Sequence, residues 1–149
     1  LPPGTSDIHL TMVQTVPVTG AVIVTTPQKI ALADATKGLS MFRQPQINVP
    51  ILGVIENMAY FTPDELPDNK YYLFGKEGGK KLAEKYEVPF LGELPIVQSI
   101  RESGDSGYPA VLKNGITREA YMGLAESVAR QIAIRNASQQ KTEIVEIKA

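Results

Sequence analysis

The sequence predicts an α/β fold built around parallel strands, and two patterns along the chain predict it. Two uniformly apolar runs, and a third run stopped by proline, have the composition of short strands, the first two buried on both faces. Segments with apolar residues at three-to-four-residue spacing separate these runs and indicate amphipathic helices. Such an alternation is typical of a parallel sheet with crossover connections. At 149 residues, the chain fits one domain with a substantial core.

The first half of the chain contains a strand, a helix and a second strand. Ser6 or Asp7 can cap an amphipathic helix that precedes this unit. Residues 21–25 form the first apolar run, residues 30–42 keep helical spacing, and residues 51–55 form the second apolar run. The connection is long enough for a right-handed crossover, so we expect two neighbouring parallel strands.

The second half repeats this alternation after an interruption. Residues 61–74 contain prolines, aspartates and an asparagine, which predicts an excursion out of the sheet layer and a candidate functional loop. A short helix over residues 76–86 leads to a third strand over residues 89–95. Residues 98–109 indicate a helical turn followed by a Gly-Asp-Ser-Gly loop, and the longest helix begins at Ile116 and should pack on the sheet.

The two ends of the chain are unusual for a domain. The start Leu1-Pro2-Pro3-Gly4 is a turn with no element before it, from which we expect a truncated chain. The tail over residues 138–149 is polar and then partly apolar, so it could add an edge strand or stay mobile. Without a linker or an internal repeat, residues 1–149 indicate a single partial domain.

Composition excludes several classes of function. Fifteen Lys and Arg balance sixteen Asp and Glu without forming a basic stripe, so we expect no nucleic-acid partner. The chain has no cysteine, which excludes disulfides, thiolate metal sites and thiol nucleophiles within it. No apolar run approaches the roughly 20 residues of a membrane-spanning helix, so we expect no membrane partner and take the cytoplasm as the default location.

Ligands of open parallel sheets bind outside the carboxyl ends of the strands. Residues 25–28, 56–58 and 94–96 follow the three predicted strands. The two threonines of the first segment could bond a ribose or cap the next helix. The amide of Asn57 could pair with a purine edge or serve a turn. Pro95 could lie flat against a base or simply end a strand.

Other candidate residues carry weaker signals. The turn from Pro2 to Thr5 could present backbone N–H groups to an anion, or it could be a rigid turn. His9 has no second ligand at metal-binding spacing, so we expect a solvated or core histidine. Gly75, Gly78 and Gly79 match neither the dinucleotide-binding pattern nor the P-loop pattern.

Five segments in chain order carry a family resemblance. They are Leu1-Pro2-Pro3-Gly4-Thr5-Ser6-Asp7, Thr25-Thr26-Pro27-Gln28, Gly53-Val54-Ile55-Glu56-Asn57-Met58, Phe74-Gly75 and Asp105-Ser106-Gly107-Tyr108-Pro109. Together they resemble the Mrp/ApbC family, a MinD-like branch of the P-loop ATPases, over nearly the whole chain up to about residue 134. The resemblance implies the carboxyl-terminal half of a doubly wound P-loop NTPase domain, without its phosphate-binding loop.

The resemblance also implies a function. Its members are dimeric ATPases that bind ATP and Mg²⁺ and act in iron-sulfur cluster assembly or transfer, with iron-sulfur proteins as clients. By resemblance, Asn57 reads adenine, the backbone around Pro95 lines the base pocket, and Gly4 and Thr5 belong to a switch that senses the terminal phosphate. No catalytic residue is expected in this chain, and these residues alone should not hydrolyse ATP.

The chain departs from the family in one loop. Many members carry a Cys-x-x-Cys pair after the Asn-Met motif, whereas residues 60–72 supply tyrosines and carboxylates, which are poor ligands for a cluster. This loop could be a dimer or client surface with Tyr71 and Tyr72 as anchors, or the two tyrosines could be core. A MinD-like regulatory ATPase that carries no cluster, and a non-enzymatic interaction module, are therefore alternatives. The open sheet edge of a half-domain also predicts a dimer or a swapped assembly.

Overall fold

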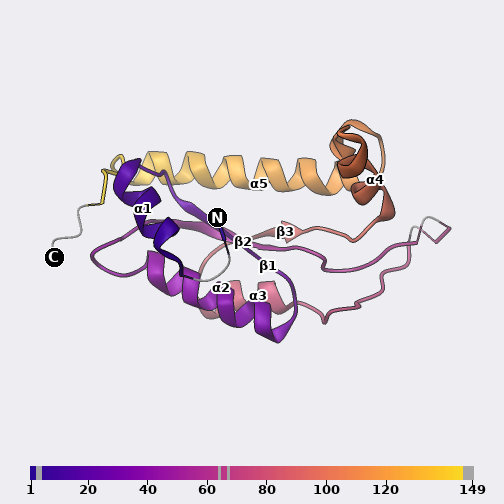
Figure 1. Cartoon of the computed structure of the whole chain (residues 1–149), viewed down its shortest axis with the longest axis horizontal. Coiled ribbons are helices and arrows are strands. Elements are labelled where there is room, and N and C mark those ends of the chain that lie inside the picture. The colour runs from indigo at the N-terminus through magenta and orange to yellow at the C-terminus, as the bar shows by residue number, and fades with distance from the viewer. Residues whose placement is uncertain (3–4, 64, 67, 146–149) are drawn as a thin grey trace.

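The chain folds into three layers in a computed structural model, which describes residues 1–2, 5–63, 65–66 and 68–145. A parallel sheet forms the middle layer (Figure 1). The long helix α5 (Ile116–Ser138) covers one face, and α2 (Lys29–Phe42) and α3 (Gly78–Lys85) cover the other. This arrangement confirms the predicted α/β fold.

The sheet has three strands in the order β1-β2-β3, and both pairs are parallel. The strands are β1 (Ala21–Thr25), β2 (Ile51–Glu56) and β3 (Phe90–Glu93). Strand β1 matches the predicted residues 21–25, and β2 extends the predicted residues 51–55 by one residue. Strand β3 lies inside the predicted residues 89–95. The central strand β2 is buried along almost its whole length, as expected for a strand that pairs on both sides and is covered on both faces.

Most of the core lies between the sheet and the helices α2 and α3. Leu39 of α2 and Val54 of β2 are fully buried there, and α1 (Asp7–Thr15) adds Val13 to the same cluster. A smaller cluster of Ile55, Leu91 and Leu94 lies under α5, which covers it with three partly buried apolar residues. The longest helix therefore packs on the sheet as predicted. Among the helices of the described residues, none is long and apolar enough to cross a bilayer.

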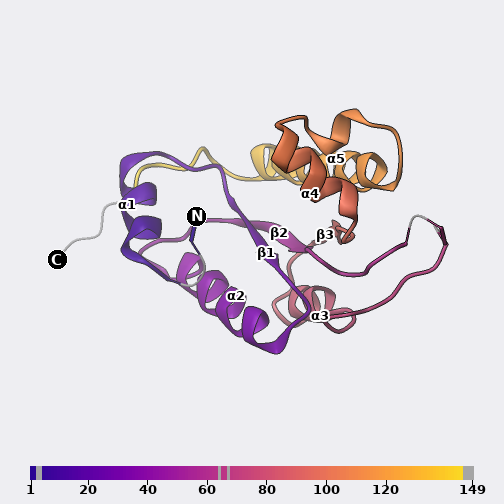
Figure 2. The same cartoon turned by 45° about the vertical axis from the view of Figure 1, so that its right-hand side comes forward.

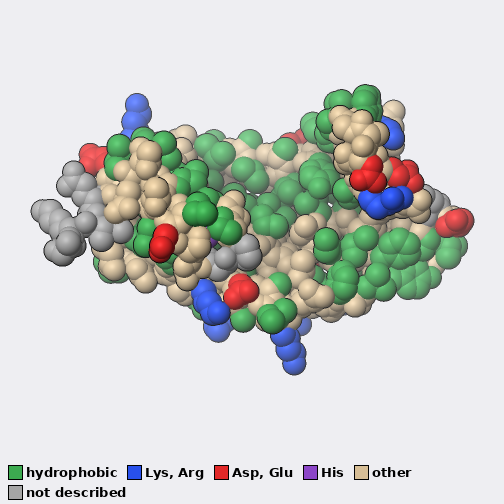
Figure 3. All heavy atoms as spheres, in the orientation of Figure 1, with side chains coloured by type: hydrophobic (Ala, Val, Ile, Leu, Met, Phe, Trp, Pro, Cys, Tyr) green, Lys and Arg blue, Asp and Glu red, His purple; other side chains and the backbone are tan. Residues whose placement is uncertain are grey.

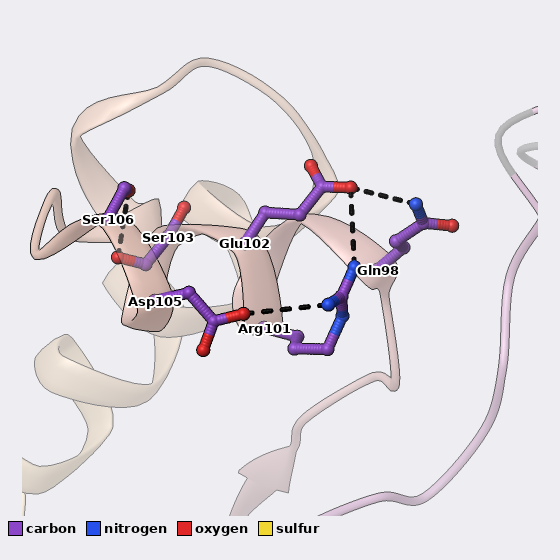
Figure 4. A network of polar contacts seen from close by, with 6 residues as sticks. All are labelled: Gln98, Arg101, Glu102, Ser103, Asp105 and Ser106. Carbon is purple, nitrogen blue, oxygen red and sulfur yellow. Dashed lines mark hydrogen bonds and ion pairs between the residues drawn. The ribbon is translucent and has the colours of Figure 1, made fainter.

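The predicted loop within residues 98–109 is wrong in its extent. Helix α4 (Gln98–Ser106) includes most of the Gly-Asp-Ser-Gly segment, and only Gly107, with a left-handed φ of 69°, ends it. Pairs at helical spacing support this extra turn on the exposed face (Figure 4): Gln98 donates to Glu102 at 2.8 Å, and Arg101 lies 3.5 Å from Asp105. A short 3₁₀ helix, η1 (Ala110–Leu112), then leads into α5.

The tail follows α5 as irregular chain and returns to the first helix (Figures 1 and 2). The Arg135 guanidinium donates to the Thr142 hydroxyl at the 2.5 Å separation of a short hydrogen bond, and the backbone N of Val145 donates to the carbonyl of Val13 at 3.1 Å. Residues 139–145 therefore form no edge strand, which removes that alternative for the described part of the tail. Residues 146–149 lie outside the described residues.

Candidate functional site

The carboxyl ends of the three strands are joined by backbone hydrogen bonds that continue past the sheet. The N–H of Asn57 donates to the carbonyl of Thr25 at 2.7 Å, and the N–H of Leu94 donates to the carbonyl of Glu56 at 2.9 Å. The N–H of Ala59 in turn donates to the carbonyl of Leu94 at 3.0 Å. Asn57 and Pro95 therefore lie at the same end of the sheet, where ligands of parallel sheets bind.

A cleft of about 780 Å³ runs along the free edge of β1 and reaches this end. Thr25, Thr26 and Asn57 line it at the carboxyl ends of β1 and β2, and apolar residues of α2 line its side. Pro95 is buried and does not line the cleft. The structure thus brings Asn57 together with the two threonines in one cavity that does not include Pro95.

Asn57 is half-buried and serves the turn that leaves the sheet. Its side-chain oxygen accepts a hydrogen bond from the backbone N of Met58 at 2.9 Å, and Met58 has a left-handed φ of 54°. The NH₂ group of the amide can still donate, and the oxygen keeps a second lone pair that can accept. The contact with Met58 therefore leaves both atoms able to pair with an adenine edge, and the adenine-reading role of Asn57 remains a prediction.

The two threonines after β1 do not cap α2, and the capping alternative is wrong. The N-cap of α2 is Gln28, which makes no side-chain capping bond. The hydroxyl of Thr25 donates to the carbonyl of Thr26 at 3.1 Å, and the hydroxyl of Thr26 donates to the side-chain oxygen of Gln28 at 3.2 Å. Both hydroxyls therefore stay within the segment that faces the cleft.

The predicted phosphate switch at the start of the chain is only partly described. Gly4 lies outside the described residues. Thr5 is exposed, precedes the Ser6 cap of α1, and does not line the cleft. The cap itself is confirmed, because the Ser6 hydroxyl accepts from the backbone N of Ile8 at 3.3 Å. The phosphate-sensing role of Gly4 and Thr5 remains a prediction.

His9 is a core residue, in agreement with one of the two expected readings. It is 4% exposed, its Nδ1 lies 3.2 Å from the carbonyl of Ser6, and its ring meets the edge of Phe42. Within the described residues, no group of three or more His, Asp or Glu side chains could hold a metal ion. With no cysteine in the chain, its donor set also does not fit an iron-sulfur cluster.

Glu56 lies at this end of the sheet, in a segment that the sequence marked as a candidate, but no role was predicted for its side chain. Its side chain is 1% exposed, and its carboxylate accepts a hydrogen bond from the backbone N of Gly79 at the start of α3. Burial raises the pKa of Glu56, the neighbouring Glu93 raises it further, and the N–H of Gly79 opposes both. The available signal was a glutamate that ends an otherwise apolar buried strand.

The excursion predicted for residues 61–74 lies within the connection from β2 to α3, over residues 57–77, whose described residues project beyond the three layers (Figure 2). Its two arms are joined by a pair of backbone hydrogen bonds between Phe61 and Tyr71, at 2.8 and 2.9 Å. Tyr71 is 45% exposed, Tyr72 is 40% exposed and Leu73 is 61% exposed, so the core alternative for the tyrosines is wrong. Apolar side chains gather on this part of the surface (Figure 3).

A parallel sheet with helices on both faces, and a cleft that reaches the strand ends, form a layered α/β domain, and the family model that the chain matches is one of P-loop NTPases. A nucleotide-binding protein of Archaeoglobus fulgidus, solved in complex with ADP, matches at 40% identity with a TM-score of 0.62, over 72% of this chain and 43% of that chain. The cell division ATPase MinD of Pyrococcus furiosus shares the fold, with a TM-score of 0.55 at 24% identity, over 75% of this chain and 43% of that chain.

The family is shown by a direct match. The ParA model, described as NUBPL iron-transfer P-loop NTPase, matches residues 1–133, and the chain belongs to this family. An iron-sulfur cluster carrier protein of Synechocystis is 46% identical over 136 residues, which is 90% of this chain and 38% of that protein. The iron-sulfur cluster transfer protein NUBPL of Dictyostelium discoideum is 44% identical over 143 residues, which is 95% of this chain and 43% of that protein.

These matches confirm the resemblance to the Mrp/ApbC proteins. They also set its extent, because the chain spans only 38% and 43% of the lengths of these two relatives.

Proposed function

We propose that the full-length protein, meaning this chain together with the amino-terminal half that the family resemblance implies, binds and hydrolyses ATP and acts in iron-sulfur cluster assembly or transfer. These 149 residues would supply base recognition and a surface for partner proteins. The observation that carries the proposal is the cleft along the free edge of β1, which reaches the carboxyl ends of β1 and β2 where Thr25, Thr26 and Asn57 line it. The ADP complex of the Archaeoglobus relative supports a nucleotide as its ligand.

The phosphates and the Mg²⁺ ion would be held by the amino-terminal half. The described residues offer no metal-binding group, and the chain has no P-loop motif. We therefore expect these 149 residues alone to show no ATP turnover. The contribution of the chain would be orientation of the base, through the side-chain amide of Asn57 and the segment at Pro95.

The proposal is tested by titrating ADP and ATP into the full-length protein with Mg²⁺ and by measuring phosphate release. We expect binding of both nucleotides and slow hydrolysis by the full-length protein, and neither hydrolysis nor tight binding by residues 1–149. Absence of nucleotide binding by the full-length protein, or turnover by the 149 residues, would contradict the proposal.

A second candidate function is a MinD-like regulatory or positioning ATPase that carries no cluster. The absence of cysteine from the chain, including the loop that follows Asn57, favours this candidate. Anaerobic reconstitution of the full-length protein with iron and sulfide, followed by visible absorption, separates the two. A stable cluster absorption supports cluster carriage, and its absence alongside ATP hydrolysis supports the regulatory candidate.

The remaining assignments concern partners and location. A homodimer, iron-sulfur client proteins and a cytoplasmic location follow from the family resemblance and are proposals here. The exposed apolar side chains of Tyr71, Tyr72 and Leu73 are suited to a protein interface, because Tyr residues supply large contact areas with a polar end. Light scattering of the full-length protein with ATP tests the dimer, for which a monomer at all concentrations would be the contrary result.

A further inference from the structure

A buried carboxylate lies at the base of the excursion, where the chain leaves β2 and returns at α3. The proposed nucleotide site does not use it. Glu56 is the last residue of β2 and directly precedes Asn57. Its carboxylate accepts a hydrogen bond from the backbone N of Gly79, 23 residues further along the chain. The chain leaves the sheet just after Glu56 and returns to it at α3, so this contact joins the two ends of the excursion.

The start of α3 is shaped around this carboxylate. A Cβ added to Gly79 would lie 3.1 Å from both the Cβ and the Oε2 of Glu56, so glycine leaves the room that the contact needs. Glu77, two residues earlier, has a left-handed φ of 59°, which non-glycine residues adopt rarely. After this turn, the N–H of Gly79, which has no partner inside the helix, donates to Glu56.

Folding stability alone does not account for a carboxyl group here. Burial raises the pKa of Glu56, and the charges of Glu93 on β3 and Glu77 before α3 raise it further. The N–H groups of Gly79 and Glu77 lower the pKa but do not reverse the shift. The folded protein therefore holds this charge unfavourably, whereas an apolar side chain of similar volume would avoid the penalty. The hydrogen bond to Gly79 is a contact that a carboxyl group makes here and an apolar side chain cannot make.

The backbone at Glu56 is also tied to both neighbouring strands. Its carbonyl accepts from Leu94 after β3, and the N–H of Asn57 donates to Thr25 at the end of β1. Through this backbone, the side-chain bond to Gly79 links α3 to the ends of all three strands. We propose that Glu56 is a positioning residue that holds the N–H of Gly79, at the start of α3, against the end of β2, fixing both ends of the excursion and the orientation of Asn57.

The part that concerns Asn57 rests on the proposed nucleotide site, and the part that concerns the excursion does not. The two parts are therefore measured separately on the full-length protein. Hydrogen exchange of peptides covering residues 57–63 and 74–82 reports the excursion, with the peptide covering α2 as the internal reference. Calorimetric titration with ADP reports the site.

Glu56→Ala removes the carboxylate oxygen that accepts from Gly79 of α3. We expect exchange at residues 74–82 to accelerate by about tenfold or more, the size expected when a charged acceptor is lost, with α2 unchanged. Glu56→Gln keeps the volume and one acceptor oxygen, so it should restore a large part of the protection. A merely space-filling role predicts the same restoration by Glu56→Met, which offers no acceptor oxygen, and equal protection in the Met and Gln variants would overturn the proposal.

Glycine substitutions at α3 test the same contact from its other side. Gly79→Ala pushes on the carboxylate, so its effect on exchange should be smaller in the Glu56→Ala background than in the wild type. Gly78→Ala is the matched control, because its Cβ would meet Leu32 and Pro27 instead of Glu56, and its effect should add to that of Glu56→Ala. Additivity of Gly79→Ala with Glu56→Ala would contradict a direct contact.

The ADP titration separates failure of this inference from failure of the proposed function. We expect Glu56→Ala to weaken ADP binding by about tenfold, as for loss of one such hydrogen bond, and Glu56→Gln to recover most of it. If the wild-type protein binds no ADP, the proposed function fails, while the exchange measurements still decide the role of Glu56 in the excursion. If wild type and Glu56→Ala bind ADP equally, the positioning of Asn57 by Glu56 is refuted and the proposed function stands.

Discussion

The base of the excursion and its outer part are held in opposite ways. At the base, Glu56 is almost fully buried and its backbone and side chain are hydrogen-bonded to neighbouring elements. In the outer part, Tyr71, Tyr72 and Leu73 expose between 40% and 61% of their surface, and one backbone pair joins the two arms. The difference separates two tasks, because a rigid base can orient a site while an exposed apolar surface is suited to partner contact.

Contacts in the outer part are individually weak and join exposed side chains to the buried ring of Tyr60, which is 6% exposed. The Lys70 ammonium lies 4.0 Å from the centre of the Tyr60 ring, and the rings of Tyr60 and Tyr72 meet edge to face at 6.5 Å. Each such contact contributes about 0.5–1.5 kcal/mol. Substitutions at the base should therefore change stability more than substitutions in the outer part.

The largest effect is expected for Gly79→Val at the base. The larger side chain overlaps the position of the Glu56 carboxylate, and we expect the free energy of unfolding to fall by about 1–3 kcal/mol, as for other overpacked sites. Gly104→Ala in α4 is the matched control, since nothing lies within 4 Å of its Cβ and it should gain up to about 1 kcal/mol as a helix position. Urea unfolding measures both. Equal effects at the two glycines would show that the space around Gly79 is no more restricted than the space around Gly104.

A pH dependence should mark the base as well. Because burial raises the pKa of Glu56 in the folded protein, the folded state binds its proton more tightly than the unfolded state does. The contribution of Glu56 to stability is therefore most favourable at low pH, declines as pH rises from the unfolded pKa through the raised folded pKa, and is constant above it. Glu56→Gln should lose this slope, which denaturant unfolding from pH 4 to pH 8 would measure. Parallel curves of stability against pH for the two proteins would show that folding does not raise the pKa of Glu56.

The strands could be predicted from sequence, whereas the contacts at their ends could not. Residues 21–25 and 51–55 are short and uniformly apolar, which is the pattern expected of strands in a parallel sheet that is buried on both faces. The extent of α4 was missed because Gly-Asp-Ser-Gly is typical of a loop, while the pair between Arg101 and Asp105 exists only once the helix has formed. The contact of Glu56 with Gly79 links residues far apart in sequence, so no local pattern reports it.

The candidate site was predicted in part for the same reason. The carboxyl-end rule places Asn57 correctly beside a cleft, because parallel strands bring their ends to one edge. It cannot tell that Pro95 is buried and does not line that cleft, or that the oxygen of Asn57 accepts a hydrogen bond from Met58. Those details depend on side-chain packing after the chain has left the sheet.

A smaller effect on stability is expected for Tyr72→Ala in the outer part. The substitution removes the edge-to-face contact with the Tyr60 ring. It also removes the contact of the Tyr72 ring with the Lys76 ammonium, which lies 5.0 Å from the ring centre, so the free energy of unfolding should fall by about 1 kcal/mol. Thermal unfolding of the full-length protein measures the change. A loss as large as that of Gly79→Val would show that the outer part is structural rather than a contact surface.

The smallest effect on stability is expected for Leu73→Ser. Since Leu73 is 61% exposed, the free energy of unfolding should change by no more than about 0.5 kcal/mol. If the outer part is a protein interface, the same substitution should weaken self-association or client binding of the full-length protein, which light scattering measures. Unchanged association in both Leu73→Ser and Tyr72→Ala would argue against an interface at this surface.

The central claim is that the cleft at the strand ends, beside Asn57, belongs to a nucleotide site. Its most direct test is the affinity of the full-length protein for ADP, compared between wild type and Asn57→Ala. We predict binding by the wild type and affinity about tenfold lower in the variant, as expected for loss of one hydrogen bond. Equal affinity of the two proteins, with both folded, would contradict the claim.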